Sequence, residues 1–265
     1  MPGALAVATS VRATGSRLPF VVMHAGKLGS KSVEALTSVP GVELRKVDAI
    51  ANPHGHGEAR FANVFTKLNV FALEEFERVA YLDADTLVLQ GIEDIFSESC
   101  VFAAAPDHGV ALRRAEFNSG VFVCKPDRGI YRDMLAKVRG VPSRDGGDQG
   151  FLNEYFRGWK RLPSSYNTLK RIYWHHPDLF DLSQVKVLHF VGDKPWDRPP
   201  ADYARFSELY DLWWSRYPAA LLPIKRVLPP LARITSGIVR AVRPLRRRVA
   251  PILRRFDFDG DSTYG

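Results

Sequence analysis

The strongest constraint on the fold is an apolar run, Val79 to Leu82, that ends in two carboxylates one residue apart, Asp83 and Asp85. Alternation along an extended strand would place both side chains on one face. Two carboxylates at the end of a buried strand repel each other and cost desolvation free energy unless a positive group lies between them. Oxygen ligands favour a hard divalent cation, Mg²⁺ or Mn²⁺. The alternative is a strand that ends in solvent with two acidic turn residues.

Helical and extended patterns alternate on both sides of this run. This rhythm predicts an α/β fold with a doubly wound, mostly parallel sheet that binds ligands at the carboxyl ends of its strands. The pattern predicts strands over residues 18–23, 42–47, 79–83, 101–105, 120–124 and 185–190. It predicts helices over residues 5–11, 31–38, 61–76, 131–138, 149–157 and 203–217.

Composition indicates one globular domain, residues 1–217, followed by a basic extension, residues 218–265. Residues 221–255 hold ten Lys and Arg and no acid, so the net charge of +8 belongs to the extension rather than to the domain. Cys100 and Cys124 adjoin apolar runs and are expected to be buried thiols. No secretory signal and no apolar stretch of membrane-spanning length is visible. We therefore expect a cytoplasmic protein.

The extension has two interpretations. Prolines interrupt it, yet Ile238, Val242, Leu245, Val249 and Ile252 recur at helical spacing with arginines on the other faces. Such a segment either stays solvated or packs on the domain, or it holds the protein peripherally on an anionic membrane surface through residues 221–255. Specific nucleic acid binding is not expected, because the segment lacks interleaved aromatic residues.

Four segments downstream of Asp83 carry further polar side chains in a fixed order. They are residues 117–123, 145–153, 162–167 and 187–196. Together with the Asp-x-Asp pair, they resemble the glycogenin-like glycosyltransferases of family 8 over roughly residues 4–197. The resemblance implies a GT-A fold, a UDP-sugar donor, a bound Mn²⁺ with Mg²⁺ as the alternative ion, and transfer of a hexose with retention of anomeric configuration. UDP-glucose is the default donor.

The resemblance also implies roles for individual residues. The metal ligands would be Asp83, Asp85 and His189, since two carboxylates and an imidazole suit Mn²⁺. Asp148 would recognise a sugar hydroxyl, and Gln149 would face the reacting carbon opposite the leaving group. The residues expected to bind the donor are Lys67, Asn118, Ser119, Gly120, Asp145, Gly192 and Lys194.

The chain departs from the family pattern at two places. The apolar strand that precedes the first helix in the family has no counterpart before Met1, so the first strand of the sheet is expected to be missing. Between Gly192 and Lys194 there is one residue where the family usually has two. Tyr173 lies near the position of a self-glycosylated tyrosine, but its surroundings favour a packed side chain.

Two other functions remain open from the sequence. Asp83-x-Asp85-x-Thr also fits the haloacid-dehalogenase-type phosphatases, in which Asp83 would be the nucleophile and Asp85 the general acid, with Mg²⁺. A domain that holds a UDP-sugar or carbohydrate without turnover is the other alternative. The acceptor, whether glycan, protein or lipid-linked, is not readable, and a homodimer is also left open.

Overall fold

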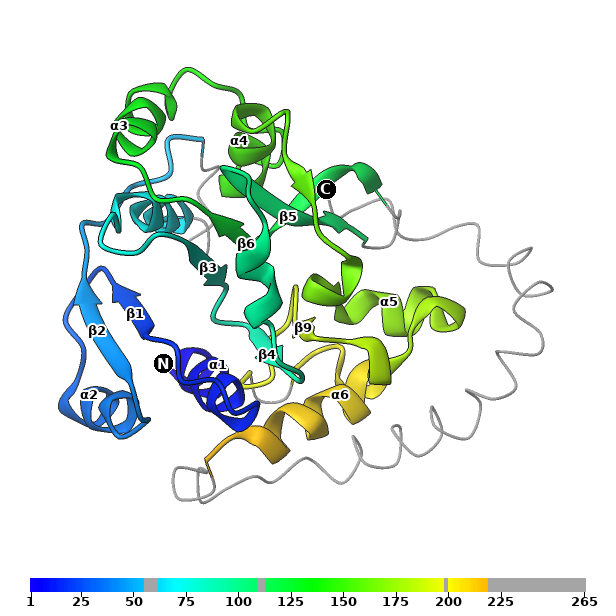
Figure 1. Ribbon diagram of the computed structural model, residues 1–265. Helices are drawn as coiled ribbons and strands as arrows, with labels where there is room; N and C mark the ends of the chain where they lie inside the picture. The colour runs from blue at the N-terminus through cyan, green and yellow to red at the C-terminus, as the bar shows by residue number, and fades with distance from the viewer. Residues whose placement is uncertain (55–61, 109–112, 198–199, 219–265) are drawn as a thin grey trace.

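The computed structural model describes residues 1–54, 62–108, 113–197 and 200–218 (Figure 1). The basic extension from residue 219 onward, with its predicted amphipathic helix and membrane contact, lies outside these residues. Within the described ranges, no helix is both long enough and apolar enough to cross a membrane. Both cysteines are free thiols, and Cys124 is buried as predicted, whereas Cys100 is only partly buried.

The amino-terminal part is a small layer of two strands and two helices. Helix α1 (Pro2–Ala13) precedes strand β1 (Phe20–His24), and helix α2 (Ser30–Thr37) joins β1 to strand β2 (Val42–Lys46). The two strands pair in parallel, with Phe20 opposite Val42. This is the expected strand–helix–strand unit. α2 ends at Thr37, and a turn through Pro40 and Gly41 leads into β2, with Gly41 at a positive φ of 68°.

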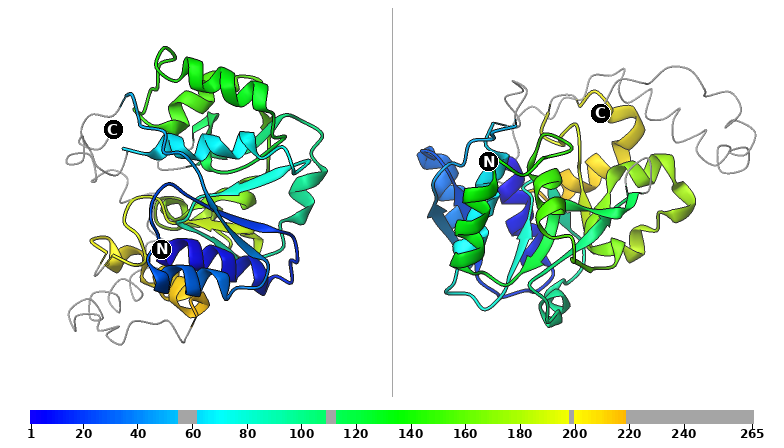
Figure 2. Two further views of the ribbon diagram at one scale, coloured as in Figure 1. Left: turned by 90° about the vertical axis from the view of Figure 1, so that its left-hand side faces the viewer. Right: turned by 90° about the horizontal axis from the view of Figure 1, so that it is seen from above.

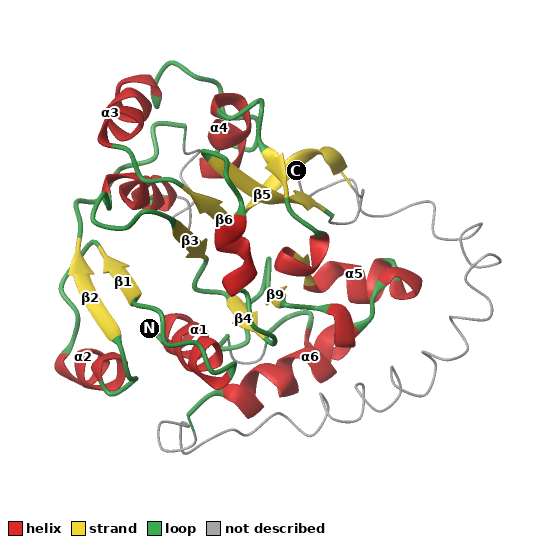
Figure 3. Ribbon diagram, in the orientation of Figure 1, coloured by secondary structure: helices red, strands yellow, loops and turns green. Residues whose placement is uncertain are grey.

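Two further sheets form the centre of the molecule. In the first, β3 (Val79–Leu82), β6 (Arg113–Cys124), β5 (Phe102–Asp107) and β7 (Lys160–Arg161) lie in the order β3-β6-β5-β7. In the second, β4 (Thr86–Val88), β9 (Val187–His189) and β8 (Thr168–Leu169) lie in the order β4-β9-β8. Figure 3 shows how these short strands meet near the middle of the fold.

The expected α/β class is confirmed, but the strand pairings are mixed rather than mostly parallel. β6 runs antiparallel to both β3 and β5, and β9 runs antiparallel to β4. β6 follows β5 after only five residues (108–112), and so short a connection joins antiparallel strands, whereas a parallel crossover needs a dozen residues or more. The expected strand over residues 120–124 is the end of this longer β6.

Helices cover the sheets on two sides (Figure 2). One apolar cluster joins β3, β5 and β6 to a 3₁₀ segment, η2 (Val64–Ala72), and to helices α3 (Arg128–Lys137) and α4 (Asp148–Tyr155). Another joins α1, α2, α5 (Lys170–His175) and α6 (Tyr203–Arg216) around β4 and β9. Short 3₁₀ turns occupy Glu93–Ser97, Ser164–Asn167, Pro177–Leu179 and Leu182–Gln184.

The predicted helix over residues 61–76 is the 3₁₀ segment η2 in the structure. Within it, the Asn69 side-chain amide donates to the Thr66 carbonyl (2.8 Å) and to the Asp48 carbonyl (3.0 Å). A side chain that bonds to nearby backbone competes with the regular helical ladder. Sequence periodicity does not distinguish this tighter winding from an α-helix.

A gap separates β1 from β3, where the missing first strand is expected. Among the described strands, β1 pairs only with β2, and β3 pairs only with β6. A cavity of about 1100 Å³ is lined by both strands and by side chains of α1, including Val7. Every residue of β1 and β3 is partly exposed, whereas every residue of β4 and β9 is buried.

The pairing identifies which backbone groups face the gap. Phe20 N–H donates to Gly41 O and Asp83 N–H donates to Gly120 O, and bonding alternates along each strand. We therefore expect the amides of Val21, Met23, Ala80 and Leu82 to exchange on the order of a hundredfold faster than those of Val22 and Tyr81. Residue-resolved hydrogen exchange by NMR measures this difference. Equal protection of both sets would mean that another strand fills the gap in solution.

Candidate active site

Three side chains that can ligate a metal converge where the two central sheets meet. Asp83 follows β3, Asp85 precedes β4, and His189 is the last residue of β9, opposite Thr86. One ligand atom from each of Asp83, Asp85 and His189 lies within 4.8 Å of the others. The structure thus brings together the three residues that the sequence predicts as metal ligands, and this donor set fits a divalent cation.

A turn, rather than alternation along a strand, brings the two carboxylates together. β3 ends at Leu82, and the Asp83 carbonyl accepts hydrogen bonds from the Thr86 backbone N–H (3.1 Å) and from Thr86 Oγ1 (2.8 Å). The prediction of a shared strand face is wrong, because the chain leaves the extended conformation at Asp83. The turn places Asp83 at the end of one sheet and Asp85 at the start of the other.

The imidazole of His189 is held in one position by its neighbours. Its Nε2 lies 3.1 Å from Asp85 Oδ1, and its Nδ1 lies 2.9 Å from Asn167 Oδ1. A Cβ at Gly120 would lie 2.1 Å from the His189 ring, so only glycine leaves room for the ring there. Donor binding by Gly120 stays a prediction, whereas the structure shows that a side chain at this position would clash with the His189 ring.

Asp85 is partly buried and is paired with two basic groups. His189 Nε2 contacts one carboxylate oxygen, and Lys194 Nζ contacts the other. Burial by itself would raise the pKa of Asp85, but the interactions with His189 and Lys194 outweigh burial and hold that pKa below its usual value. The Asp85 carboxylate is therefore anionic at any pH near neutrality.

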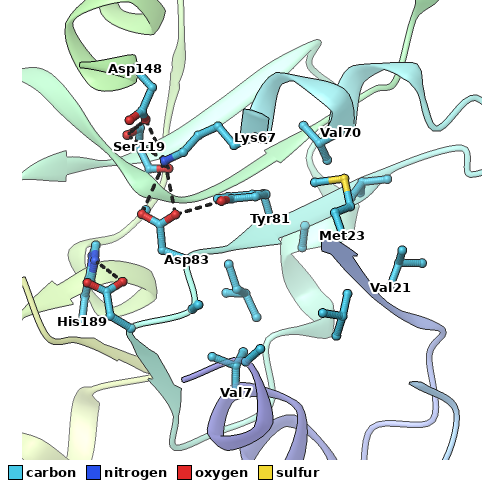
Figure 4. Close-up of a pocket in the computed structure, with 18 of the residues that line it drawn as sticks. Val7, Val21, Met23, Lys67, Val70, Tyr81, Asp83, Ser119, Asp148 and His189 are labelled. Carbon is cyan, nitrogen blue, oxygen red and sulfur yellow. Dashed lines mark hydrogen bonds and ion pairs between the residues drawn. The ribbon is translucent and has the colours of Figure 1, made fainter. Parts of the chain in front are cut away.

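Lys67 is buried between the carboxylate of Asp83 and Asp148, at the start of α4 (Figure 4). Its Nζ lies 2.7 Å from Asp148 Oδ2 and 3.2 Å from Asp83 Oδ1, and its side chain is 7% exposed. Burial opposes its charge, but the two carboxylates raise the pKa of Lys67 well above its usual value. Burial, together with the nearby charge of Asp83, raises the pKa of Asp148 despite the pull of Lys67. Tyr81 donates to Asp83 Oδ1 (2.8 Å) and completes the network.

The residues at the start of α4 face β6. Asp148 Oδ2 accepts from Ser119 Oγ (2.6 Å), and Gln149 Oε1 accepts from Asn118 Nδ2 (2.9 Å). Asp145 is exposed and lines the same cavity, but its Oδ1 also accepts from backbone N–H groups of the turn that starts α4. Four predicted side chains, those of Asn118, Ser119, Asp148 and Gln149, therefore form one wall of the cavity.

The loop that carries Gly192 and Lys194 borders the same cavity and is fixed from behind by a buried lysine. Gly192 has a positive φ of 77°, which permits the tight bend before Lys194. Lys170 Nζ, in a side chain only 1% exposed, donates to Asp193 O (2.8 Å) and lies 2.7 Å from Asp202 Oδ2. Desolvation lowers the pKa of Lys170 even though Asp202 opposes the shift. Asp193, the one residue between Gly192 and Lys194, is thus anchored to the start of α5.

Sequence reasoning missed Asn167, Asp107 and Lys170 as contributors to this region. Gln149 Nε2 donates to Asp107 Oδ2 (3.2 Å) at the end of β5. Asn167 lay within a segment of the recognised pattern, but only its spatial contact with His189 gives it a task. For Lys170, which is followed by Arg171 in the sequence, no local signal indicated burial. Tyr173, by contrast, is 6% exposed and donates to Glu208, consistent with the expected packed side chain.

Comparison with known proteins identifies the family. The pattern of Glycosyl transferase family 8 matches residues 52–199. The chain belongs to this family. It is 32% identical over 226 residues to the putative UDP-glucuronate:xylan alpha-glucuronosyltransferase 4 of Arabidopsis thaliana, which covers 81% of this chain and 39% of that protein. It is 31% identical over 229 residues to glycogenin of Neurospora crassa, which covers 82% of this chain and 33% of that protein.

Solved structures support the fold. The glycosyltransferase GlyE of Streptococcus pneumoniae TIGR4 superposes with a TM-score of 0.63 at 17% identity, covering 91% of this chain and 60% of that one. The bifunctional glycosyltransferase WbbM gives 0.59 at 14% identity, covering 89% of this chain and 49% of that one. These likenesses establish the GT-A fold of the family 8 chain and nothing beyond it. The chain spans only about a third to two fifths of the relatives from Arabidopsis and Neurospora.

The Lys67 network leads to a stability prediction. Lys67→Met leaves Asp148 buried without its counter-ion, and we expect the free energy of unfolding at pH 8 to fall by about 3–5 kcal/mol. Because the pKa of Asp148 is already raised, protonation at lower pH relieves the unpaired charge, so the loss should be smaller at pH 5. Urea denaturation at both pH values measures it.

The matched control is Lys137→Met, which breaks an exposed pair with Asp133 (53% and 44% exposed side chains). Such a surface pair contributes about 0.5 kcal/mol or less. A Lys67 variant no less stable than this control would mean that Lys67 does not neutralise Asp148 in the folded protein.

Proposed function

We propose that the chain is a retaining hexosyltransferase that moves a sugar from a UDP-sugar to a hydroxyl acceptor. The observation that supports this most is one cavity with two kinds of wall. Asp83, Asp85 and His189 lie close enough together to hold a cation at one side, and the polar ends of β6 and α4 form the other side. A cation held at the first side would bind the diphosphate of a nucleotide. The polar side chains of the second side would form hydrogen bonds with the hydroxyl groups of a sugar.

Each side chain has a task in that reaction. The cation, Mn²⁺ by preference because of the imidazole ligand, would supply positive charge against the diphosphate leaving group. Lys194, on the loop bordering the cavity, would orient the diphosphate and stabilise its developing charge. Asp148, fixed by Lys67 and Ser119, would accept a hydrogen bond from a sugar hydroxyl. Gln149 would line the face of the sugar opposite the leaving group, without forming a covalent bond.

The proposal includes the identity of the transferred sugar. UDP-glucose is our default from the likeness to glycogenin. Other relatives are named for glucuronate transfer to xylan and to inositol phosphorylceramide, so UDP-glucuronate is the first alternative to test. Glycan, protein and lipid-linked acceptors all stay within the proposal, as does a cytoplasmic location with peripheral membrane contact.

Membership of the family favours glycosyl transfer over the phosphatase alternative. In the phosphatase alternative, the segment from Gly192 to Asp197 would supply Asp193 and Asp197 as further metal-binding acids. In the structure, Asp193 Oδ2 accepts from Asp202 N–H (3.1 Å), and Asp197 Oδ2 accepts from Lys194 N–H (2.9 Å). A domain that binds without turnover is the remaining alternative. Hydrolysis of a panel of UDP-sugars separates it from an active transferase.

The decisive measurement is calorimetric titration of the chain with UDP in the presence of Mn²⁺, Mg²⁺ or EDTA. We expect binding that requires the cation and is tighter with Mn²⁺. Asp85→Asn removes a charged ligand and should weaken UDP binding with Mn²⁺ on the order of a hundredfold. UDP binding that is equally tight in EDTA, or unchanged in the variant, would contradict the metal role.

Asp133→Asn is the control for this titration. It removes a carboxylate from an exposed pair on α3 and should leave UDP binding unchanged. If no UDP binds under any condition, the proposed donor is wrong, and a phosphatase assay with Mg²⁺ becomes the next measurement.

A further inference from the structure

Side-chain amides connect the sugar-facing wall of the cavity to the imidazole of His189. The first amide is that of Asn118, whose Oδ1 accepts from the backbone N–H of Gly120 (3.0 Å). Because a backbone N–H can only donate, this contact fixes which end of the Asn118 amide carries the oxygen. The nitrogen end then donates to Gln149 Oε1 (2.9 Å), which also accepts from the backbone N–H of Ser119 (3.3 Å).

The hydrogen bond at the other end of this series of side-chain amides requires the same orientation. With Gln149 Oε1 accepting, its Nε2 donates to Asp107 Oδ2 (3.2 Å). A carboxylate accepts, so the orientation required by the backbone of β6 is the orientation that Asp107 requires as well. Two independent anchors therefore set one direction for every hydrogen bond in the series.

Asn167 extends the series to the imidazole. It is fully buried (0% exposed), and its Nδ2 donates to Asn118 Oδ1 (2.8 Å). Its Oδ1 is thereby directed at His189 Nδ1, 2.9 Å away. An amide oxygen has no proton to give, so His189 Nδ1 must carry a proton, whether or not Nε2 also carries one. The other nitrogen, Nε2, is the one beside Asp85 Oδ1 (3.1 Å).

We propose that Asn167 is a positioning residue that keeps a proton on His189 Nδ1 and so presents Nε2 to the cation. The proposal rests on the cation site of the proposed function and adds a group that does not itself touch the cation. Either nitrogen of a free imidazole can carry the proton or bind a metal, and the hydrogen bond at one nitrogen decides which role the other takes. In this protein the buried Asn167 amide, whose orientation is fixed, accepts from Nδ1 and leaves Nε2 for the cation.

The test compares two substitutions at one position. Asn167→Leu is close in size and removes the acceptor for His189 Nδ1, so Mn²⁺ affinity should fall about tenfold or more. Asn167→Asp keeps an oxygen that accepts from Nδ1, so Mn²⁺ affinity should stay within about threefold of the unmodified chain. Both variants lose the donor to Asn118, so both should lower the melting temperature. Free Mn²⁺ is measured by electron paramagnetic resonance on the full chain without nucleotide.

Asn153→Leu provides a matched structural control. Asn153 bridges β6 and α4 through bonds to the N–H and C=O of Phe117 and to the Gln149 carbonyl (2.9 Å each), with no bond to His189. Its loss should lower the melting temperature and leave Mn²⁺ affinity unchanged. A general loosening of the α4–β6 contact would instead weaken Mn²⁺ binding in this variant too, and would overturn the proposal.

Two further outcomes would also overturn it. One is an Asn167→Leu chain that binds Mn²⁺ as tightly as the unmodified chain. The other is an Asn167→Asp chain weakened as much as Asn167→Leu, because then the acceptor at Nδ1 is not what matters. An unmodified chain that binds no Mn²⁺ at all would remove the cation site of the proposed function, and this proposal with it.

Discussion

The buried ammonium group of Lys67 is the interaction on which the site most depends. It lies between Asp83, at the end of a strand, and Asp148, in the first turn of a helix on the other side of the cavity. Removing a charge from water is costly unless opposite charges and hydrogen bonds compensate. The Lys67 ammonium group pairs with two carboxylates and donates a hydrogen bond to the Ser119 carbonyl. One side chain therefore links the cluster of Asp83, Asp85 and His189 to the polar end of β6 and the start of α4.

A second buried lysine, Lys170, fixes the loop that borders the same cavity. Lys170 ties the loop of Gly192 and Lys194 to α5 and α6, and its Nζ also donates to the Tyr210 hydroxyl (2.6 Å). The Trp214 indole N–H donates to the Pro195 carbonyl (3.0 Å) and holds the same loop from α6. The flexible-looking glycine segment is thus backed by helices, so the position of Lys194 follows from packing that lies far away in the sequence.

Much of this arrangement could be predicted from the sequence, and the rest could not for identifiable reasons. Asp83, Asp85 and His189 belong to short segments whose residue order is specific, so their meeting was predictable. The turn at Asp83 was not, because alternation describes a strand only while the chain stays extended. The antiparallel course of β6 was not predicted either, since its apolar pattern does not carry a direction. The contacts of Asn167 with His189 and of Lys170 with Asp193 join residues about twenty positions apart or more, and no local sequence pattern reveals such contacts.

The gap between β1 and β3 bears on how the protein behaves in concentrated solution. Within the part of the chain that the structure describes, the edges of β1 and β3 have no strand partner on the side of the cavity. Such edges are templates for any extended segment that reaches them. Unfolded or nascent molecules offer extended apolar segments in abundance. Native molecules and folding intermediates then compete for the same backbone donors, which makes the yield of soluble protein depend on how quickly and at what concentration the chain folds.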